Sequence, residues 1–335
     1  MGGKSVPGKT LLLKAALDRK GVPIGPDAVS PKYNTPKCEF ILQLVWVEDD
    51  DSFSTNSSSG VWVGAHPSLG ERLAEAMLKG GHLNEVFAEG PVISYEREVT
   101  GIAGDNSRAD FVLSHGKKEG GTDCRSVLEV KTVVDTDIAA AHVPREEEEA
   151  SPNEESSPKK RKSPTKASAA KKASIGPFVS HELPYVRHAL FPWGGGAQKG
   201  PDGEKVVSAR AVKHINELAA LKRGERLANA KDASDTEGRK DREDQSNDEA
   251  GDFKQDELLG AHVLFVVNRA DALAFRPNHE ACPSFANHLK AAQSDGVGVY
   301  AHRVTWGQGC DEGKAFYSGE VPVSWNLIPI PERTA

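Results

Sequence analysis

Two short stretches decide the fold of this chain: Ser107-Arg108-Ala109-Asp110-Phe111 and, after a polar loop, Leu128-Glu129-Val130-Lys131-Thr132-Val133. Both are rich in apolar residues, and the loop between them is rich in glycine, so they are predicted to be successive strands. Because side chains alternate along a strand, we expect Glu129 and Lys131 on one face of the sheet. Antiparallel pairing across the loop would bring Asp110 near Glu129.

This arrangement of charges predicts a site for a divalent cation. Two neighbouring carboxylates suit Mg²⁺ or Mn²⁺, which prefer oxygen ligands and keep several waters. A lysine beside them can orient a water and stabilise charge that develops on a phosphate. A Glu-x-Lys pair in a strand is also a common solvent-facing pair, so spacing alone leaves both interpretations open.

Further elements are predicted on both sides of these two strands. Upstream are apolar runs at 10–17 and 39–47, a helix that begins with the capping-box sequence Ser68-Leu69-Gly70-Glu71 and ends at Gly80, and a strand at 92–99. Downstream we expect a helix from Ser208 to about residue 223, a strand at 262–268, a helix at 283–294 and a strand at 297–304. Strands that alternate with helices predict an α/β or α+β sheet covered by helices.

Two stretches with few large apolar residues, at about 144–174 and 224–257, are predicted to be disordered insertions. They account for a hydrophobic fraction of only 38% in a chain of 335 residues. The four cysteines form no C-x-x-C pair, so neither a zinc ribbon nor a disulfide framework is indicated, and a reducing compartment is expected.

Charge and hydropathy limit the partners and the location. A net charge of −7 argues against nucleic-acid binding over the whole surface, so any basic patch must be local. No apolar run has the length of a membrane span, and the N-terminus lacks a signal peptide's apolar region, so an intracellular protein is expected. The basic cluster Lys159, Lys160, Arg161 and Lys162 predicts binding of a nuclear-import receptor and residence in the nucleus. The alternatives are a solvating linker and a location in the cytoplasm or an organelle.

The two opening stretches resemble the S-R-x-D-F and x-E-V-K-x-V signature of the sugar fermentation stimulation protein A family. Further matches follow in the same order, at residues 60–64, 71–75, 189–192, 210–218, 264–271 and 319–323. The resemblance covers roughly residues 8–323 apart from the two insertions, and its motifs together are specific.

The resemblance implies a PD-(D/E)xK nuclease-like domain preceded by an OB-like domain, with DNA as partner. We therefore expect an α/β (α+β) fold with a mixed sheet flanked by helices. Residues 1–50 would form a partial OB-like segment, since the family's first barrel strands have no counterpart here, and residues 51–335 the nuclease-like domain with both insertions.

The resemblance also implies roles for single residues. Asp110, Glu129 and Lys131 match the family's catalytic positions, with Asp110 and Glu129 as the metal ligands. Glu75 occupies a helix position where many such nucleases carry a further acid, although a solvated glutamate explains it equally well.

Basic residues near the opening motif and on the helix after Ser208 are the candidates for contact with nucleic acid. They are Arg108, Arg210, Lys213 and His214. A solvated helix face is the alternative explanation for the last three. Two functions follow: a Mg²⁺- or Mn²⁺-dependent nuclease that hydrolyses DNA, or a DNA-binding or regulatory protein on the same fold that does not cleave.

Overall fold

The computed structural model describes residues 9–48, 60–102, 108–116, 124–139, 178–180, 185–196, 198–201, 203–225 and 258–325. The insertion predicted at 144–174, with its basic cluster, lies outside the described residues. The insertion predicted at 224–257 also lies outside them, except for its first two residues.

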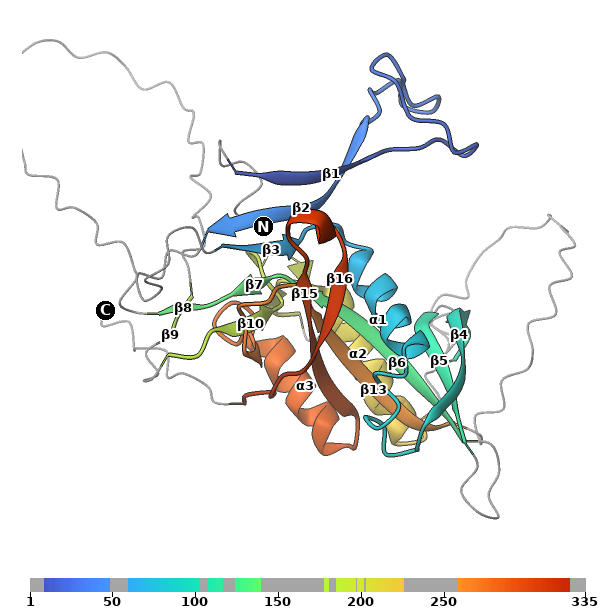
Figure 1. The fold of residues 1–335 in the computed structure, drawn as a ribbon. Coiled ribbons are helices and arrows are strands. Elements are labelled where there is room, and N and C mark those ends of the chain that lie inside the picture. The colour runs from blue at the N-terminus through green and yellow to red at the C-terminus, as the bar shows by residue number, and fades with distance from the viewer. Residues whose placement is uncertain are drawn as a thin grey trace, which may run out of the picture.

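A six-stranded mixed sheet forms the centre of the molecule, with the strand order β16-β15-β13-β6-β5-β4 (Figure 1). Its strands are β4 (Val92–Thr100), β5 (Arg108–His115), β6 (Cys124–Val133), β13 (Leu258–Val267), β15 (Gly298–Trp306) and β16 (Ala315–Glu320). The first three form an antiparallel meander, β6, β13 and β15 pair in parallel, and β16 is antiparallel to β15. The predicted fold class, a mixed sheet flanked by helices, is confirmed.

Three helices cover the two faces of this sheet: α1 (Leu69–Lys79), α2 (Ala209–Lys222) and α3 (Pro283–Ser294). On one face, Leu73 and Met77 of α1 pack with Leu128 and Val130. On the other face, α2 and α3 pack on the neighbouring positions of the same strands, in a core that includes Val127, Val133, Val263, Phe265, Ile215 and Phe285. Each large apolar side chain buried in this way contributes about 1.5 to 3 kcal/mol. Glu129 and Lys131 occupy the alternate positions of β6 whose side chains lie on the face covered by α2.

The N-termini of α1 and α2 differ in how they are capped. Ser208 caps α2 as predicted, because its Oγ accepts a hydrogen bond from the Ala211 amide at 3.2 Å. The capping box predicted at Ser68 is wrong: its side chain makes no cap hydrogen bond and lies 2.8 Å from His66 Nδ1 instead. Helix α1 forms nevertheless, since its apolar side is buried against the sheet.

The N-terminal β segment is a three-stranded antiparallel sheet of β1 (Leu11–Ala15), β2 (Phe40–Glu48) and β3 (Gly60–Gly64), drawn in blue in Figure 1. The last strand is joined to the main domain where the Gly64 amide donates to the Asn268 carbonyl at 3.0 Å. Because β3 pairs with β2, this sheet continues beyond residue 50. The division into two domains at residue 50 stays a prediction.

Several short elements lack a sequence pattern long enough to predict them. A small sheet consists of β7 (Asp135–Thr136), β10 (His188–Phe191) and β14 (Ala274–Pro277), while β8 (Ile138–Ala139) pairs with β9 (Val179–Ser180). The hairpin of β11 (Gln198–Lys199) and β12 (Lys205–Val206) stands directly before α2, and a 3₁₀ turn spans Gly309–Asp311. In the described part of the chain, no helix is long and apolar enough to cross a membrane.

Candidate metal and nucleic-acid site

Asp110 and Glu129 lie on the neighbouring strands β5 and β6. Regular pairing of these strands begins at Phe111, opposite Leu128. One residue earlier, the Asp110 side chain reaches across to β6, where its Oδ2 accepts a hydrogen bond from the Val130 amide at 2.7 Å. Glu129 is only 4% exposed, and its Oε1 contacts the Nζ of Lys131. The structure therefore brings together Asp110, Glu129 and Lys131.

The two carboxyl groups affect each other's ionisation. Burial first, and then the negative charge of Glu129, raise the pKa of Asp110 to about 6, against the lowering effects of the Val130 amide and Lys131. Burial also raises the pKa of Glu129, but the hydrogen bond from His214 and the positive charge of Lys131 outweigh it, and the net shift is downward. Two acids held this close would be stabilised by a bound cation.

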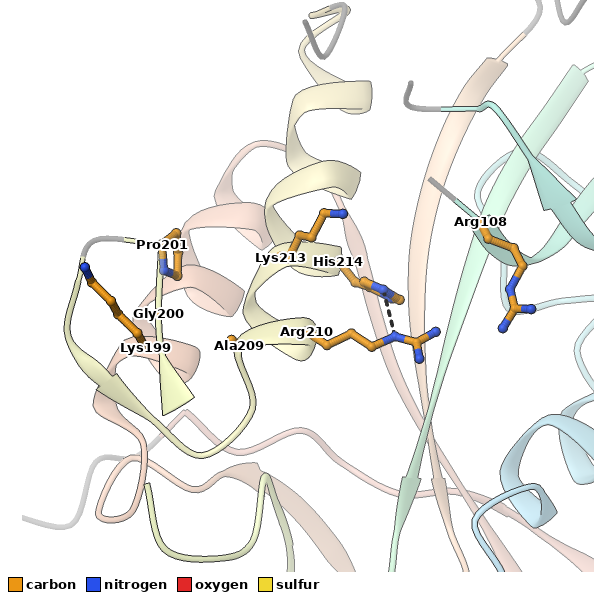
Figure 2. A pocket seen from close by; sticks show the side chains of 8 residues that line it. All are labelled: Arg108, Lys199, Gly200, Pro201, Ala209, Arg210, Lys213 and His214. Atoms are coloured by element: carbon orange, nitrogen blue, oxygen red, sulfur yellow. Dashed lines mark hydrogen bonds between the residues drawn. The ribbon is translucent and has the colours of Figure 1, made fainter. Parts of the chain in front are cut away.

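His214 lies in the same cluster, although it was predicted only to contact nucleic acid. Its Nδ1 contacts Glu129 Oε1 and lies 3.4 Å from Lys131 Nζ. On the other side of the ring, Nε2 accepts a hydrogen bond from Arg210 Nε at 3.3 Å, drawn as the dashed line in Figure 2. Helical spacing places Arg210 and His214 on one side of α2. Helical spacing alone does not predict that this side of α2 faces Glu129.

A cavity of about 480 Å³ lies beside the cluster, between the β11–β12 hairpin, the first turns of α2 and the start of β5 (Figure 2). Its lining residues are Arg108, Lys199, Gly200, Pro201, Ala209, Arg210, Lys213 and His214. Five of these carry basic side chains and none carries a carboxylate. A narrow space lined in part by Arg108 and His214 adjoins Glu129, which also lines it.

All four residues predicted to contact nucleic acid line this cavity, and Lys199 joins them. Sequence reasoning missed Lys199 because the hairpin that carries it consists of two-residue strands. A basic, hollow surface of this kind suits phosphate groups, which attract Lys and Arg through charge and hydrogen bonds. The roles of these residues remain predictions.

Glu75 is not brought into the cluster. Its carboxylate lies 2.6 Å from Arg97 Nη1 and 2.8 Å from Lys79 Nζ, and it accepts a hydrogen bond from the Tyr95 hydroxyl at 3.1 Å. The hydrogen bond with Lys79 is the largest influence on its pKa, which is lowered. A different acid of α1, Glu71, lies one helical turn before Glu75, and its negative charge contributes to the raised pKa of Asp110.

The acidic pair can be tested for its fit to a metal ion. Within the described ranges, no group of three or more His, Cys, Asp and Glu side chains is arranged to hold one. The donor set is therefore two carboxylates. In the part of the chain that the structure describes, no hydrogen bond reaches Asp110 Oδ1 or Glu129 Oε2, so each acid has one oxygen available. Two carboxylate oxygens fit Mg²⁺ or Mn²⁺, which complete their coordination with water.

Comparisons with known proteins indicate which family this chain resembles. Residues 254–309 match the model of the sugar fermentation stimulation protein RE domain. A comparison with curated proteins finds no match. Among solved structures, SfsA of Pyrococcus furiosus, described as a complex with Ca²⁺, aligns with a TM-score of 0.38 and 15% identity over 88% of this chain and 80% of that chain.

The matched segment contains β13, α3 and β15. It does not contain β5, β6 or α2, which carry the acidic pair, Lys131 and the basic cavity. The match over residues 254–309 confirms that this chain resembles the sugar fermentation stimulation protein A family, as its motifs predicted.

Proposed function

We propose that this protein is a divalent-metal-dependent nuclease that hydrolyses phosphodiester bonds in DNA. The observation that supports this most is the position of Asp110, Glu129 and Lys131 beside a basic cavity of about 480 Å³. Acids that suit a cation, a lysine and a surface that suits phosphate thus occur within one site. A metal-dependent nuclease can use this combination of groups to stabilise charge on a phosphate and to activate water.

The chemistry of each side chain determines its proposed role in the site. Asp110 and Glu129 would hold Mg²⁺ or Mn²⁺, which when bound would stabilise negative charge on the phosphate and lower the pKa of a water. Lys131, beside Glu129, would orient the attacking water and stabilise charge on the scissile phosphate. Arg108, Lys199 and Lys213 would neutralise phosphates along the DNA backbone, which positions the strand without reading its sequence.

A DNA-binding or regulatory protein that does not cleave is the second candidate. The basic cavity favours it independently of the acids, since its arginine and lysine side chains would attract phosphates whether or not a metal is present. Both candidates predict binding to DNA. Only the nuclease predicts products whose formation depends on a divalent cation and on Lys131.

We propose a partial OB-like segment over residues 1–50 and a nuclease-like domain over 51–335. We also propose that the basic cluster at 159–162 binds a nuclear-import receptor, on the evidence of its sequence alone.

The test is cleavage of supercoiled plasmid, linear duplex and single-stranded DNA by the full chain. With Mg²⁺ or Mn²⁺ we expect products from at least one substrate, and with a chelator none. Lys131→Ala should cut at least about 100-fold more slowly, the usual loss when one charge-stabilising group is removed from an active site. Lys290→Ala is the matched control, because Lys290 is exposed on α3 and does not line the basic cavity.

Three outcomes separate the candidates. If no substrate is cut but DNA still shifts in a gel, the protein binds without cleaving. If neither occurs, both candidates are wrong. If Lys131→Ala cuts as fast as the wild type, the nuclease remains but Lys131 has no part in it.

A further inference from the structure

Arg210, His214 and Lys131 make contacts that converge on one oxygen of the acidic pair, Oε1 of Glu129. Arg210 and His214 stand one turn apart on α2, and Arg210 Nε lies 3.3 Å from His214 Nε2 (Figure 2). The opposite ring nitrogen, Nδ1, contacts Oε1 of Glu129 on β6. Lys131 Nζ contacts the same oxygen.

The chemistry of these groups determines where the proton of the imidazole lies. A guanidinium only donates hydrogen bonds, so the nitrogen that it contacts, Nε2, must accept. In a neutral imidazole the other nitrogen then carries the hydrogen, and Nδ1–H is directed at a carboxylate, which only accepts. Lys131 Nζ lies 3.4 Å from Nδ1, which would require that nitrogen to accept. This is the longest of the three contacts, and we assign the lysine to Glu129.

We propose that His214 is a positioning residue that holds Glu129 through its Nδ1–H, and that Arg210 selects this tautomer. The inference rests on the proposed function, in which Glu129 is a ligand of the cation. His214 and Lys131 both converge on Oε1, which leaves Oε2 available for the metal. Partners that orient a metal ligand in this way typically change metal affinity by about 10- to 100-fold.

The burial of the pair strengthens this interaction. The side chains of His214 and Glu129 are 13% and 6% exposed, so little water competes for the hydrogen bond between them. This hydrogen bond therefore limits the orientations of the carboxylate that is proposed to bind the cation.

Arg210 connects this arrangement to the basic cavity. Its Nε donates to His214, while in the described residues no hydrogen bond reaches Nη1 or Nη2, and the side chain lines the cavity. A phosphate bound by these two nitrogens would contact the same guanidinium that determines the tautomer of His214. Phosphate binding and the orientation of Glu129 thus share one residue.

The substitutions can be chosen so that the fold survives. Helix α2 is anchored by Val212, Ile215 and Leu218, and His214 lies outside that apolar core. His214→Leu removes the donor, whereas His214→Asn keeps an amide N–H near the position of Nδ1. Asn216→Leu, a half-buried polar position on the same helix, is the control, since the hydrogen bonds described for Glu129 come from Lys131 and His214. Circular dichroism melts check that each variant is folded.

The first measurement is the affinity of the full chain for Mn²⁺, followed by electron paramagnetic resonance of the free ion. We expect His214→Leu to bind about 10- to 100-fold more weakly, and His214→Asn and Asn216→Leu to stay close to the wild type. Equal affinity of wild type and His214→Leu would overturn the positioning role and leave the proposed function standing. A wild type that binds no Mn²⁺ would overturn both.

The second measurement needs no metal. Nitrogen-15 NMR of the neutral His214 ring distinguishes a protonated Nδ1 from a protonated Nε2. We expect the Nδ1–H tautomer in the wild type and a mixture of both tautomers in Arg210→Ala. A protonated Nε2 in the wild type, or an unchanged tautomer in Arg210→Ala, would contradict the role assigned to Arg210.

Discussion

Replacing Asp110 with asparagine should stabilise the metal-free protein at alkaline pH, although it removes an acid of the proposed cation site. Burial first, and then the charge of Glu129, raise the pKa of Asp110 from 3.8 to about 6. Because the folded-state pKa lies above the unfolded value, the folded protein favours the protonated carboxyl. The resulting penalty is absent below the unfolded pKa, grows as pH rises, and is fully present above the folded pKa of about 6.

The size of this penalty follows from the two pKa values. The difference between about 6 and 3.8 is about 2 pH units. At about 1.36 kcal/mol per unit, it corresponds to at most about 3 kcal/mol at pH 8. Asp110 is only partly buried, so we expect a gain of about 1 to 3 kcal/mol in Asp110→Asn. Asparagine keeps an oxygen that can accept the hydrogen bond from the Val130 amide.

The assay is thermal denaturation in a chelator at several pH values between 4 and 8. At about 2 to 4 °C per kcal/mol for a domain of this size, Asp110→Asn should raise the melting temperature by several degrees at pH 8. The gain should shrink towards pH 4. Asp27→Asn, at an exposed aspartate, should show no such trend. A gain that does not change with pH, or a loss of stability at pH 8, would refute the reasoning.

Three further substitutions test other parts of the molecule. Lys213→Ala should lower the slope of log affinity for duplex DNA against log salt by about 0.9, the contribution of one phosphate contact. Fluorescence anisotropy over a salt series measures this slope, and an unchanged slope would show that Lys213 makes no contact with a phosphate. Gly70→Ala should destabilise the protein by about 1 to 3 kcal/mol, because the added Cβ would lie 2.0 Å from Thr132 Oγ1. Urea denaturation measures this loss, and an unaltered midpoint would show that the contact relaxes freely. A fluorescent fusion with Lys159, Lys160, Arg161 and Lys162 changed to alanine should leave the nucleus, and an unaltered distribution in cells would rule out the import signal.

The regular elements were predictable wherever a periodic apolar pattern continued for two turns of helix or for most of a strand. The meander around Asp110 and Glu129 and the helix at Pro283–Ser294 are examples. The parallel pairing of β13 with β6 was not predictable, because the second insertion and α2 separate these strands in the sequence. The two-residue strands were missed since they depend on tertiary contacts.

The positions of the predicted site residues could be foreseen from the sequence only in part. Asp110, Glu129 and Lys131 form a sequence motif, and the strands that carry it place them together. The contact of His214 with Glu129 depends on how α2 packs on the sheet, which a helical pattern does not specify. The cap at Ser68 failed for a local reason, because His66 takes its hydroxyl as a hydrogen-bond partner.

The central claim is that Asp110 and Glu129 together hold the divalent cation. The most direct measurement is an anomalous difference map from crystals of the full chain grown with Mn²⁺. We predict a peak about 2.0 to 2.6 Å from one oxygen of each carboxylate, the range in which these cations bind oxygen. A map without a peak at this pair, or with its strongest peak on other ligands, would contradict the claim.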